Sequence, residues 1–461
     1  MTADGLGGTI ARYDARGRTV FVLECIVTKF GGSSLASDEQ FRKVRSILEL
    51  EPTRLYLIPS APGKRFPTDE KVTDLLYDCH ALAAEGKPFD DLFVKIRERY
   101  LSIAQHLHLE VDIEDALDEV HRGIAGGKSR DWCASRGEYL CGLLVADYLG
   151  WRFVDAAEGI RFRDDGTLDD EKTQELLSGL LKDRKPSVVP GFYGSRANGE
   201  VVTFSRGGSD ITGALVARAV GADVYENWTD VSGFLMADPR IIDGPAEISS
   251  ITYKELRELS HMGASVLHED AMFPVHRVGI PTNIRNTNKP YHPGTLISKN
   301  APNEVSVPTI TGIAGHQGYS VINVEKNMMN SEVGFGRKVL SILEEYGISF
   351  EHMPTGIDSM CVVVKSELLA SHREEILEKL EKLVDGSGSV TVSDNLSIIA
   401  TVGRGMVHNC GTAARLFSAM SRARINVRMI DQGSSELSII VGVNDSDFEA
   451  TIRAIYHEFV G

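Results

Sequence analysis

Short β-type runs alternate with helical apolar stripes between residues 25 and 298. The runs are short, and they lie at residues 25–30, 55–58, 187–190, 201–204, 223–227 and 281–286. Apolar residues recur at helical spacing between them, as at Val72, Leu75, Leu76, Cys79 and Leu82. This alternation predicts an α/β domain of three layers, with helices on both faces of a mainly parallel central sheet.

The character of the sequence changes after this domain. Residues 299–310 are mostly polar, contain prolines and show no periodicity, which is typical of a linker. We therefore expect an N-terminal extension at 1–24, the α/β domain at 25–298 and, beyond the linker, two further domains at 311–392 and 393–461.

The last third of the chain contains an internal repeat. Three landmarks of the first copy recur in the second at one constant offset: Gly334, Ile348 and Val362 correspond to Gly411, Ile425 and Ile439. In each copy the glycine begins a helix, and the two apolar residues mark strands. The repeat predicts two small ferredoxin-like units of the β-α-β-β-α-β kind. It leaves open which copy the final helix and strand complete.

Charge and apolar content restrict the class of function. The chain has 65 acidic and 49 basic residues and a formal net charge of -16, which disfavours nucleic acid and anionic lipid as partners. No apolar run approaches the roughly 20 residues that span a bilayer, and residues 1–18 lack the apolar core of a secretory signal. Six cysteines are scattered without a Cys-x-x-Cys pair, which indicates reduced thiols and no metal site. We expect a cytoplasmic protein.

The first candidate site follows the first β-type run. Lys29 precedes Gly31, Gly32 and Ser33, and a helix follows. Adjacent glycines let backbone N–H groups approach phosphate oxygens, and a helix N-terminus adds partial positive charge. The glycines alone are equally compatible with a structural turn, and neither a Walker loop nor a dinucleotide fingerprint is present. The preceding lysine favours a phosphate site.

Three more segments carry polar groups suited to binding. Arg206 and Asp210 flank two glycines and offer a carboxylate clamp and an ammonium acceptor, which suits an amino-acid ligand. Thr229 and Asp230 follow a β-type run and suit a ribose or phosphates, although Thr-Asp before a turn is also common loop chemistry. Glu138 lies in a helical pattern, where an exposed carboxylate is the simpler interpretation.

Taken together, the motifs resemble the aspartate kinases of the amino-acid-kinase superfamily. The resemblance rests on an ordered set: KFGGSS at 29–34, SRGE at 135–138, SRGGSD at 205–210, NWTDVSGF at 227–234, ADPR at 237–240 and GASVLHE at 263–269. It implies an amino-acid-kinase domain followed by two ACT domains. The implied reaction transfers phosphate from ATP, with Mg2+, to L-aspartate and begins the biosynthesis of lysine, threonine and methionine.

The resemblance also implies roles for individual residues. Phosphate contacts are implied for Lys29, Gly31, Gly32 and Ser33, and aspartate contacts for Ser34, Glu138, Arg206, Ser209 and Asp210. Nucleotide contacts are implied for Thr229, Asp230, Leu235, Arg240, Ser265 and Val266. Lys29 and Asp210 are the expected catalytic residues. The sequence departs from the family pattern at Leu235, often a tyrosine, and at Ser265, often a lysine.

A regulatory site is implied in the first ACT copy. Its candidate effector-binding residues are Met328, Asn330, Ser331, Gly334, Phe335 and Glu351. Without the resemblance, the methionines would be interpreted as core and the polar residues as a solvated loop. Lysine is favoured over threonine as the effector, and pairing of ACT domains implies a homodimer or a dimer of dimers. Two alternatives stay open: a kinase of another carboxylate such as glutamate, and a catalytically idle amino-acid sensor.

Overall fold

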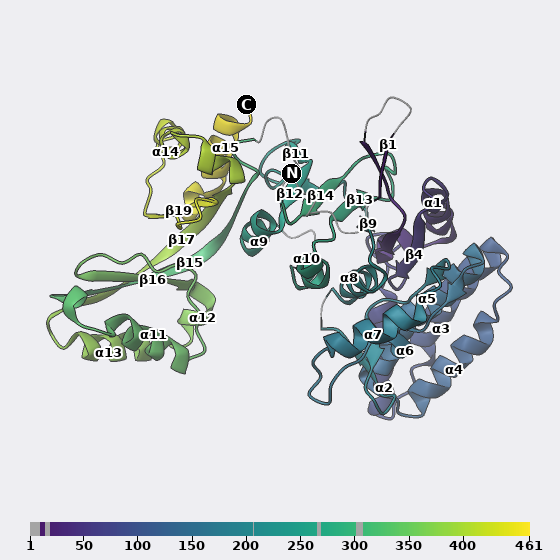
Figure 1. The fold of residues 1–461 in the computed structure, drawn as a ribbon. Helices are drawn as coiled ribbons and strands as arrows, with labels where there is room; N and C mark the ends of the chain where they lie inside the picture. Colours follow the sequence, from purple (N-terminus) through teal and green to yellow (C-terminus); the bar gives the residue numbers. More distant parts are fainter. Residues whose placement is uncertain (1–9, 14–18, 206, 265–268, 301–307) are drawn as a thin grey trace. The chain divides into compact units, whose positions relative to one another are not determined.

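The computed structural model describes residues 10–13, 19–205, 207–264, 269–300 and 308–461. The chain forms two compact units (Figure 1). The first unit comprises residues 1–234, 249–253 and 266–302, and the second comprises residues 235–248, 254–265 and 303–461. Two short segments between strands of the first unit therefore belong to the second.

The first unit is built on an eight-stranded sheet. In spatial order its strands are β12 (Ser250–Thr252), β14 (Thr295–Ser298), β13 (Thr282–Asn286), β9 (Val224–Thr229), β3 (Ile26–Phe30), β4 (Arg54–Pro59), β6 (Ser187–Val188) and β5 (Arg152–Phe153). Neighbouring strands run parallel except β13 and β14. The predicted mainly parallel sheet is confirmed.

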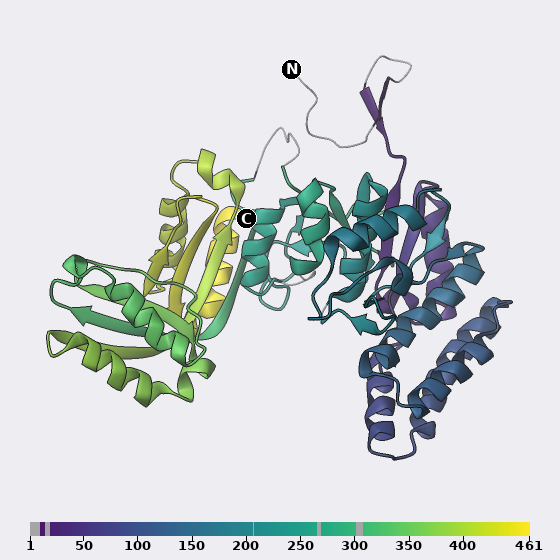
Figure 2. The same ribbon diagram turned by 60° about the horizontal axis from the view of Figure 1, so that its bottom comes forward.

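Helices cover both faces of this sheet (Figures 1 and 2). One face carries α1 (Asp38–Glu49), α2 (Val72–Ala84), α3 (Asp90–Leu107), α4 (Ile113–Ala125) and α5 (Arg130–Leu149); the other carries α7 (Asp170–Leu180), α8 (Gly208–Val220) and α10 (Phe273–Val278). Side chains of a strand alternate between faces. Phe30, Leu57 and Trp228 accordingly join the core with α1 and α5, whereas Lys29 and Asn227 lie on the α8 face.

Smaller elements complete the first unit. They are the 3-10 helices η1 (Gly32–Leu35) and η2 (Glu269–Met272), helix α6 (Ala156–Gly159) and strands β7 (Tyr193–Ser195) and β8 (Val201–Thr203). β8 corresponds to the predicted run at 201–204, but it pairs antiparallel with β7 and lies outside the main sheet. Part of the predicted N-terminal extension forms a hairpin of β1 (Ile10–Tyr13) and β2 (Thr19–Val22).

The second unit contains a five-stranded antiparallel sheet. Its spatial order is β16 (Ser359–Lys365), β15 (Gly312–Lys326), β17 (Gly388–Val402), β19 (Ser438–Asn444) and β18 (Met429–Asp431). β15 and β17 are long and pair along almost their whole length. The first part of β15 pairs with the second part of β17, so both ferredoxin-like modules share these two strands.

Two hydrophobic cores lie on this shared sheet. One contains residues of α11 (Phe335–Glu345), α12 (Ser366–Ala370) and α13 (Arg373–Val384). The other contains residues of α14 (Thr412–Arg422) and α15 (Phe448–Phe459), together with Ile310 and Ile313. The final helix therefore completes the second core, and the beginning of β15 contributes to it as well. The sequence had left this point open.

The remaining elements are β10 (Phe234–Leu235), β11 (Glu247–Ile248), α9 (Tyr253–His261) and the 3-10 helices η3 (Met329–Ser331), η4 (Arg404–His408) and η5 (Asp445–Asp447). The strand expected at Ile348 does not form; only isolated bridges join His352 and Thr355 to β16. Pro354 lies between them and has no N–H to donate, which interrupts a ladder. In the second copy, β18 is the corresponding strand.

Among the described residues, no helix is long and apolar enough to cross a membrane. None of the six cysteines is in a disulfide, and only Cys410 is exposed.

Sharing of β15 and β17 predicts that the two modules unfold together. Leu343→Ala removes a buried side chain from the first core and Leu416→Ala one from the second. Each change is expected to cost about 2–5 kcal/mol and to lower the midpoint of the same transition in differential scanning calorimetry of the full chain. Leu368→Ala, at a half-exposed position of α12, is the control. Two transitions, each moved by only one variant, would contradict shared folding.

Candidate active site

A cavity of about 630 Å³ opens where β3, β4 and β9 end. Gly32 and Ser33 follow β3, residues 60–73 follow β4, and Asp230 follows β9; Glu138 of α5 completes the lining. The carboxyl ends of parallel strands are the usual place for a ligand in an open α/β sheet. The structure therefore brings three of the predicted motifs to one cavity.

In the glycine loop after β3, one backbone N–H group is hydrogen-bonded within the fold and two others are candidates for binding a ligand: Gly31 is bonded, whereas Gly32 and Ser33 line the cavity. Gly31 N–H donates to the Trp228 carbonyl at 3.0 Å, so this amide is already occupied. For Gly32 and Ser33, no acceptor for the N–H is found in the part of the chain that the structure describes. Because both residues line the cavity, these two amides are the ones placed to receive an anion.

The loops after β3 and β4 lie against each other with no room for side chains. A Cβ on Gly32 would lie 2.8 Å from the Ala61 carbonyl oxygen, and one on Gly63 would lie 2.6 Å from the Gly32 carbonyl carbon. Gly63 N–H donates to the Gly32 carbonyl at 2.8 Å. Glycine at both positions is thus a steric requirement of the cavity wall.

Arg99 of α3 fixes the second of these loops. Its guanidinium donates to the Gly63 carbonyl at 2.7 Å and to the Asp69 carboxylate at 2.7 Å. Arg65 hydrogen-bonds the same carboxylate and, as the main cause, holds the pKa of Asp69 below its usual range. The loop that carries Lys64 and Lys71 into the cavity lining is therefore anchored by a partly buried ion-pair cluster.

Lys29 and Asp210 form an ion pair beside the glycine loop. Lys29 Nζ lies 2.6 Å from Asp210 Oδ1, and Asn227 Nδ2 donates to the same oxygen at 2.9 Å. A Cβ on Gly31 would lie 3.7 Å from Lys29 Nζ, which places the ammonium group next to the loop. Ser209, in the same first turn of α8, packs against Gly191. Arg206 lies outside the described residues.

Glu138 is buried, not exposed as the simpler interpretation of its helix suggested. Burial raises the pKa of its carboxyl to about 8, against the opposing effect of a backbone hydrogen bond from Ala61. Oε2 of Glu138 has no hydrogen-bond partner among the described residues. An unpartnered buried carboxylate oxygen is costly, so its place in the cavity lining indicates a site for a cationic group of a ligand.

The remaining predicted substrate and nucleotide residues lie in different places. Ser34 Oγ is 2.7 Å from Thr287 Oγ1 in a buried pair. Thr229 Oγ1 donates to Asp230 Oδ1 at 3.2 Å in the first unit. Leu235 and Arg240 belong to the second unit, where Arg240 pairs with Asp238 at 2.6 Å. Ser265 and Val266 lie outside the described residues.

Sequence reasoning missed several cavity residues. Ser60, Lys64, Lys71 and Thr73 line the cavity together with Glu138. The signal was present, because Ser-Ala-Pro-Gly follows the end of β4 just as the first glycine loop follows β3.

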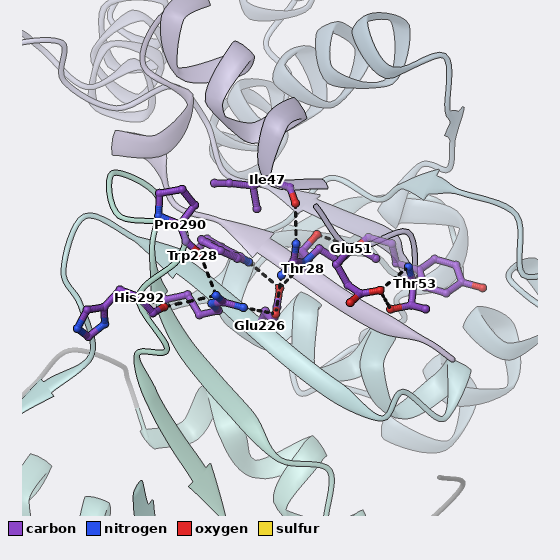
Figure 3. A network of polar contacts seen from close by, with 11 residues as sticks. Thr28, Ile47, Glu51, Thr53, Glu226, Trp228, Pro290 and His292 are labelled. Atoms are coloured by element: carbon purple, nitrogen blue, oxygen red, sulfur yellow. Dashed lines mark hydrogen bonds and ion pairs between the residues drawn. The ribbon is translucent and has the colours of Figure 1, made fainter. Parts of the chain in front are cut away.

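A buried polar network around Glu226 was also missed (Figure 3). It lies on the opposite face of the sheet from Lys29 and Asn227, because side chains of a strand alternate between faces. Glu226 accepts from Arg54 at 2.8 and 3.1 Å, from Arg285 at 3.1 Å and from the Trp228 indole N–H at 2.9 Å. Main-chain carbonyls of Ile47, Pro290 and His292 accept further hydrogen bonds from the two guanidinium groups. The glutamate between Tyr225 and Trp228 in the predicted β-type run at 223–227 was the available signal for this network.

The predicted effector residues lie at the start of α11 in the second unit. Gly334 caps this helix with a φ of 83°, and Met328 also has a positive φ, of 62°. Ser331 Oγ donates to the Met328 carbonyl at 2.8 Å, and Asn330 N–H donates to the Ile357 carbonyl at 3.1 Å. Phe335 is buried in the first core. The loop is thus tightly folded, with Met328 largely exposed.

Glu351 is engaged within the second unit. Its carboxylate lies 2.8 Å from Nε2 of His261 on α9, and its N–H donates to the Val363 carbonyl. A ligand ammonium group would therefore have to replace His261 at this carboxylate. Among the described residues, no group of three or more His, Cys, Asp and Glu side chains is arranged to hold a metal ion.

The fold and the cavity together define a small-molecule kinase of the α/β class, with open loop amides, an adjacent lysine and a buried carboxylate for a cationic group. Comparison with known proteins gives the family. Residues 24–286 match the model of the amino acid kinase family, and residues 399–459 match an ACT domain.

Individual proteins agree with these matches. Aspartokinase 3 of Bacillus subtilis is 39% identical, over 94% of this chain and 98% of its own length. The crystal structure of Clostridium acetobutylicum aspartate kinase has a TM-score of 0.88 and 51% identity, covering 94% of this chain and 100% of that one. Escherichia coli aspartokinase III in complex with lysine and aspartate has a TM-score of 0.71 and 25% identity, covering 95% and 100%. The chain belongs to the amino acid kinase family, among the aspartate kinases with ACT domains.

The pKa of Glu138 predicts the pH dependence of substrate capture. If ionised Glu138 binds a substrate ammonium group, kcat/KM for that substrate should rise about tenfold per pH unit below pH 8 and level off above it. Glu138→Gln should lower kcat/KM and remove this limb. Initial rates with the amino-acid substrate limiting, between pH 6 and 9.5, measure both effects.

The same variant provides its own folding control. The folded pKa of Glu138 lies above its ordinary value, so its ionisation lowers the free energy of unfolding as pH rises from about 4.5 towards 8. Glu138→Gln should therefore unfold at a higher temperature than the parent at pH 8.5. An inactive variant that is also less stable would assign Glu138 a structural role only.

Proposed function

We propose that this chain transfers the γ-phosphoryl group of ATP, bound with Mg2+, to the β-carboxylate of L-aspartate, giving ADP and 4-phospho-L-aspartate. The observation that carries the proposal is that Gly32, Ser33 and Glu138 line one cavity. Within the described part of the chain, the Gly32 and Ser33 N–H groups have no acceptor and Oε2 of Glu138 has no hydrogen-bond partner. The cavity thus has one wall for phosphate and one group for an ammonium ion. The named aspartate kinases with high coverage support the choice of aspartate.

In this proposal the substrate is held from several sides. Glu138 receives the aspartate ammonium group, and the Ser60 and Thr73 hydroxyls line the same cavity. Arg206 binds the α-carboxylate by the charge pairing that its motif suggests. Further contacts come from residues that the resemblance implies: Ser34, Ser209 and Asp210.

The phosphates are held by the glycine loop and its neighbours. Gly32 and Ser33 donate their open amides, and Lys29 supplies a full positive charge beside them, while Gly31 keeps its structural bond to Trp228. Nucleotide contacts are proposed for Thr229, Asp230, Leu235, Arg240, Ser265 and Val266. A structure of Escherichia coli aspartokinase III in complex with aspartate and ADP supports this pair of ligands.

The proposed chemistry needs positioning more than acid–base catalysis. A β-carboxylate with a pKa of about 3.9 is already ionised at neutral pH, so no general base is required. A carboxylate oxygen forms a bond to the γ-phosphorus, and the bond to the β–γ bridging oxygen breaks, leaving its electron pair on ADP. Lys29 offsets negative charge on the transferred group. Asp210, bound to Lys29 through Oδ1, holds that ammonium group in place until phosphate replaces it.

ADP release by the purified chain tests the proposal. Release is expected with MgATP and L-aspartate, not with L-glutamate, and excess EDTA should abolish it. Lys29→Ala should lower kcat about 100- to 1000-fold, whereas the surface variant Lys87→Ala should leave it unchanged. Turnover with glutamate would favour another carboxylate kinase. Absence of turnover with both substrates, together with effector binding in calorimetry, would favour an idle amino-acid sensor.

For regulation, we propose that an amino acid, lysine in preference to threonine, binds at the start of α11 and inhibits the kinase. The effector residues are Met328, Asn330, Ser331, Gly334, Phe335 and Glu351, and Glu351 exchanges His261 for the effector ammonium group. Escherichia coli aspartokinase III in complex with lysine and aspartate supports lysine. The enzyme would act in the cytoplasm in amino-acid biosynthesis, as a homodimer or a dimer of dimers.

Glu351→Gln separates effector binding from catalysis. Loss of the charge should raise the lysine concentration for half-inhibition at least about tenfold, as expected for a lost charge-assisted hydrogen bond, with kcat unchanged. Glu374→Gln, on the exposed side of α13, is the matched control. Inhibition by threonine alone in the parent enzyme would refute the choice of lysine, and an unaltered lysine response in Glu351→Gln would refute the role of Glu351.

A further inference from the structure

We propose that three consecutive residues at the end of β13, Arg285, Asn286 and Thr287, are positioning residues that hold three separate parts of the active site in place. The proposal rests on the proposed function above. None of the three lines the cavity, so each acts through a residue that does or that adjoins it. β13 is placed for this task because it neighbours β9, which in turn neighbours β3.

Thr287 holds Ser34, which is proposed to contact aspartate. Its Oγ1 lies 2.7 Å from Oγ of Ser34, and both side chains are buried, with 2% of each exposed. Ser34 follows Gly32 and Ser33 in η1, so this bond ties the short helix of the glycine loop to a strand two places away. An apolar pair could fill the same space at little cost to stability. A hydroxyl pair instead fixes the orientation of the Ser34 side chain.

Asn286 holds the turn after β9, whose Thr229 and Asp230 are proposed to contact the nucleotide. Its Nδ2 donates to the Asp230 carbonyl at 3.1 Å and to Ser232 Oγ at 2.9 Å. Next to it, Thr287 N–H donates to the Thr229 carbonyl at 2.8 Å. The turn that carries Thr229 and Asp230 is therefore fastened at two carbonyls and one hydroxyl. An unfastened turn would leave Asp230 free to leave the cavity wall.

Arg285 holds the glycine loop, which the proposed function assigns to the phosphates. Its guanidinium lies over the Trp228 ring at 4.6 Å and donates to Glu226. The Glu226 carboxylate also accepts from the Trp228 indole N–H (Figure 3). The Trp228 carbonyl in turn receives Gly31 N–H. Arg54, from β4, contacts the same ring and the same carboxylate. The position of the glycine loop is thus set by a ring that two guanidinium groups contact.

The three attachments predict three different kinetic defects. Thr287→Val should raise KM for aspartate about five- to tenfold, the effect of one lost hydrogen bond, with KM for ATP within about twofold of the parent. Thr287→Ser should restore the parent value. Asn286→Ala should raise KM for ATP by a similar factor and leave KM for aspartate unchanged. Arg285→Lys should lower kcat while changing neither KM by more than about twofold.

Thr282→Val is the matched control at the other end of β13. It makes the same change of hydroxyl to methyl at a buried position, where Thr282 Oγ1 has a 3.4 Å contact to the Tyr253 hydroxyl. If β13 only supports the fold, Thr287→Val and Thr282→Val should behave alike. Initial-rate measurements with each substrate varied in turn, together with thermal unfolding of every variant, distinguish these outcomes.

The results separate this proposal from the proposed function. A parent enzyme that turns over aspartate, with variants showing the three-way split, supports both. An active parent whose variants lose kcat uniformly, or lose only stability, overturns the positioning role and leaves the function intact. A parent with no aspartate-dependent release of ADP overturns both. Should Arg285→Lys fail to fold, the other two variants still test the positioning role, because Thr287→Val should raise only KM for aspartate and Asn286→Ala only KM for ATP.

Discussion

The carboxylate of Glu226 is the buried charge around which the central sheet of the first unit is organised. A buried ion is tolerated only when its partners satisfy it, and here Arg54, Arg285 and the Trp228 indole all do so. Arg285 comes from β13, Trp228 from β9 itself and Arg54 from β4, on the far side of β3, so the network fixes these strands relative to one another. Through the Trp228 carbonyl the same network reaches Gly31, and the glycine loop inherits its position.

Glu138 is also buried, but its carboxylate, unlike that of Glu226, is not fully hydrogen-bonded within the described part of the chain. One of its oxygens has no partner among the described residues, and its raised pKa reflects the cost. A fold optimised only for stability would pair or remove this group. The contrast with Glu226 separates two uses of buried carboxylates in one domain: a satisfied one that builds the structure, and an unsatisfied one that awaits a ligand.

Features that depend on apolar periodicity and on turn-forming residues could be predicted from the sequence. The parallel sheet, the long helices and the two repeated modules follow from local patterns, and the glycine loop after β3 was visible as a motif. Contacts between distant residues were not visible, because nothing in the run at 281–286 indicates that Asn286 and Thr287 meet Asp230 and Ser34. The burial of Glu138 was also hidden, since α5 is buried on nearly all sides and has no polar face to mark the exception.

Connectivity gives the proposed feedback a physical route. Residues 235–248 and 254–265 leave the sheet of the first unit and pack with the second, where Ala237, Ile241 and Ile242 join the core of α14 and α15. Arg240, a proposed nucleotide residue, lies on the first of these segments, and His261, the partner of Glu351, lies on the second. A ligand that displaces His261 therefore acts on a segment covalently continuous with β12 of the catalytic sheet. Because packed cores shift between discrete arrangements, an effector that binds Glu351 in place of His261 would bias these segments through the new contacts it makes, without a direct contact between effector and substrate.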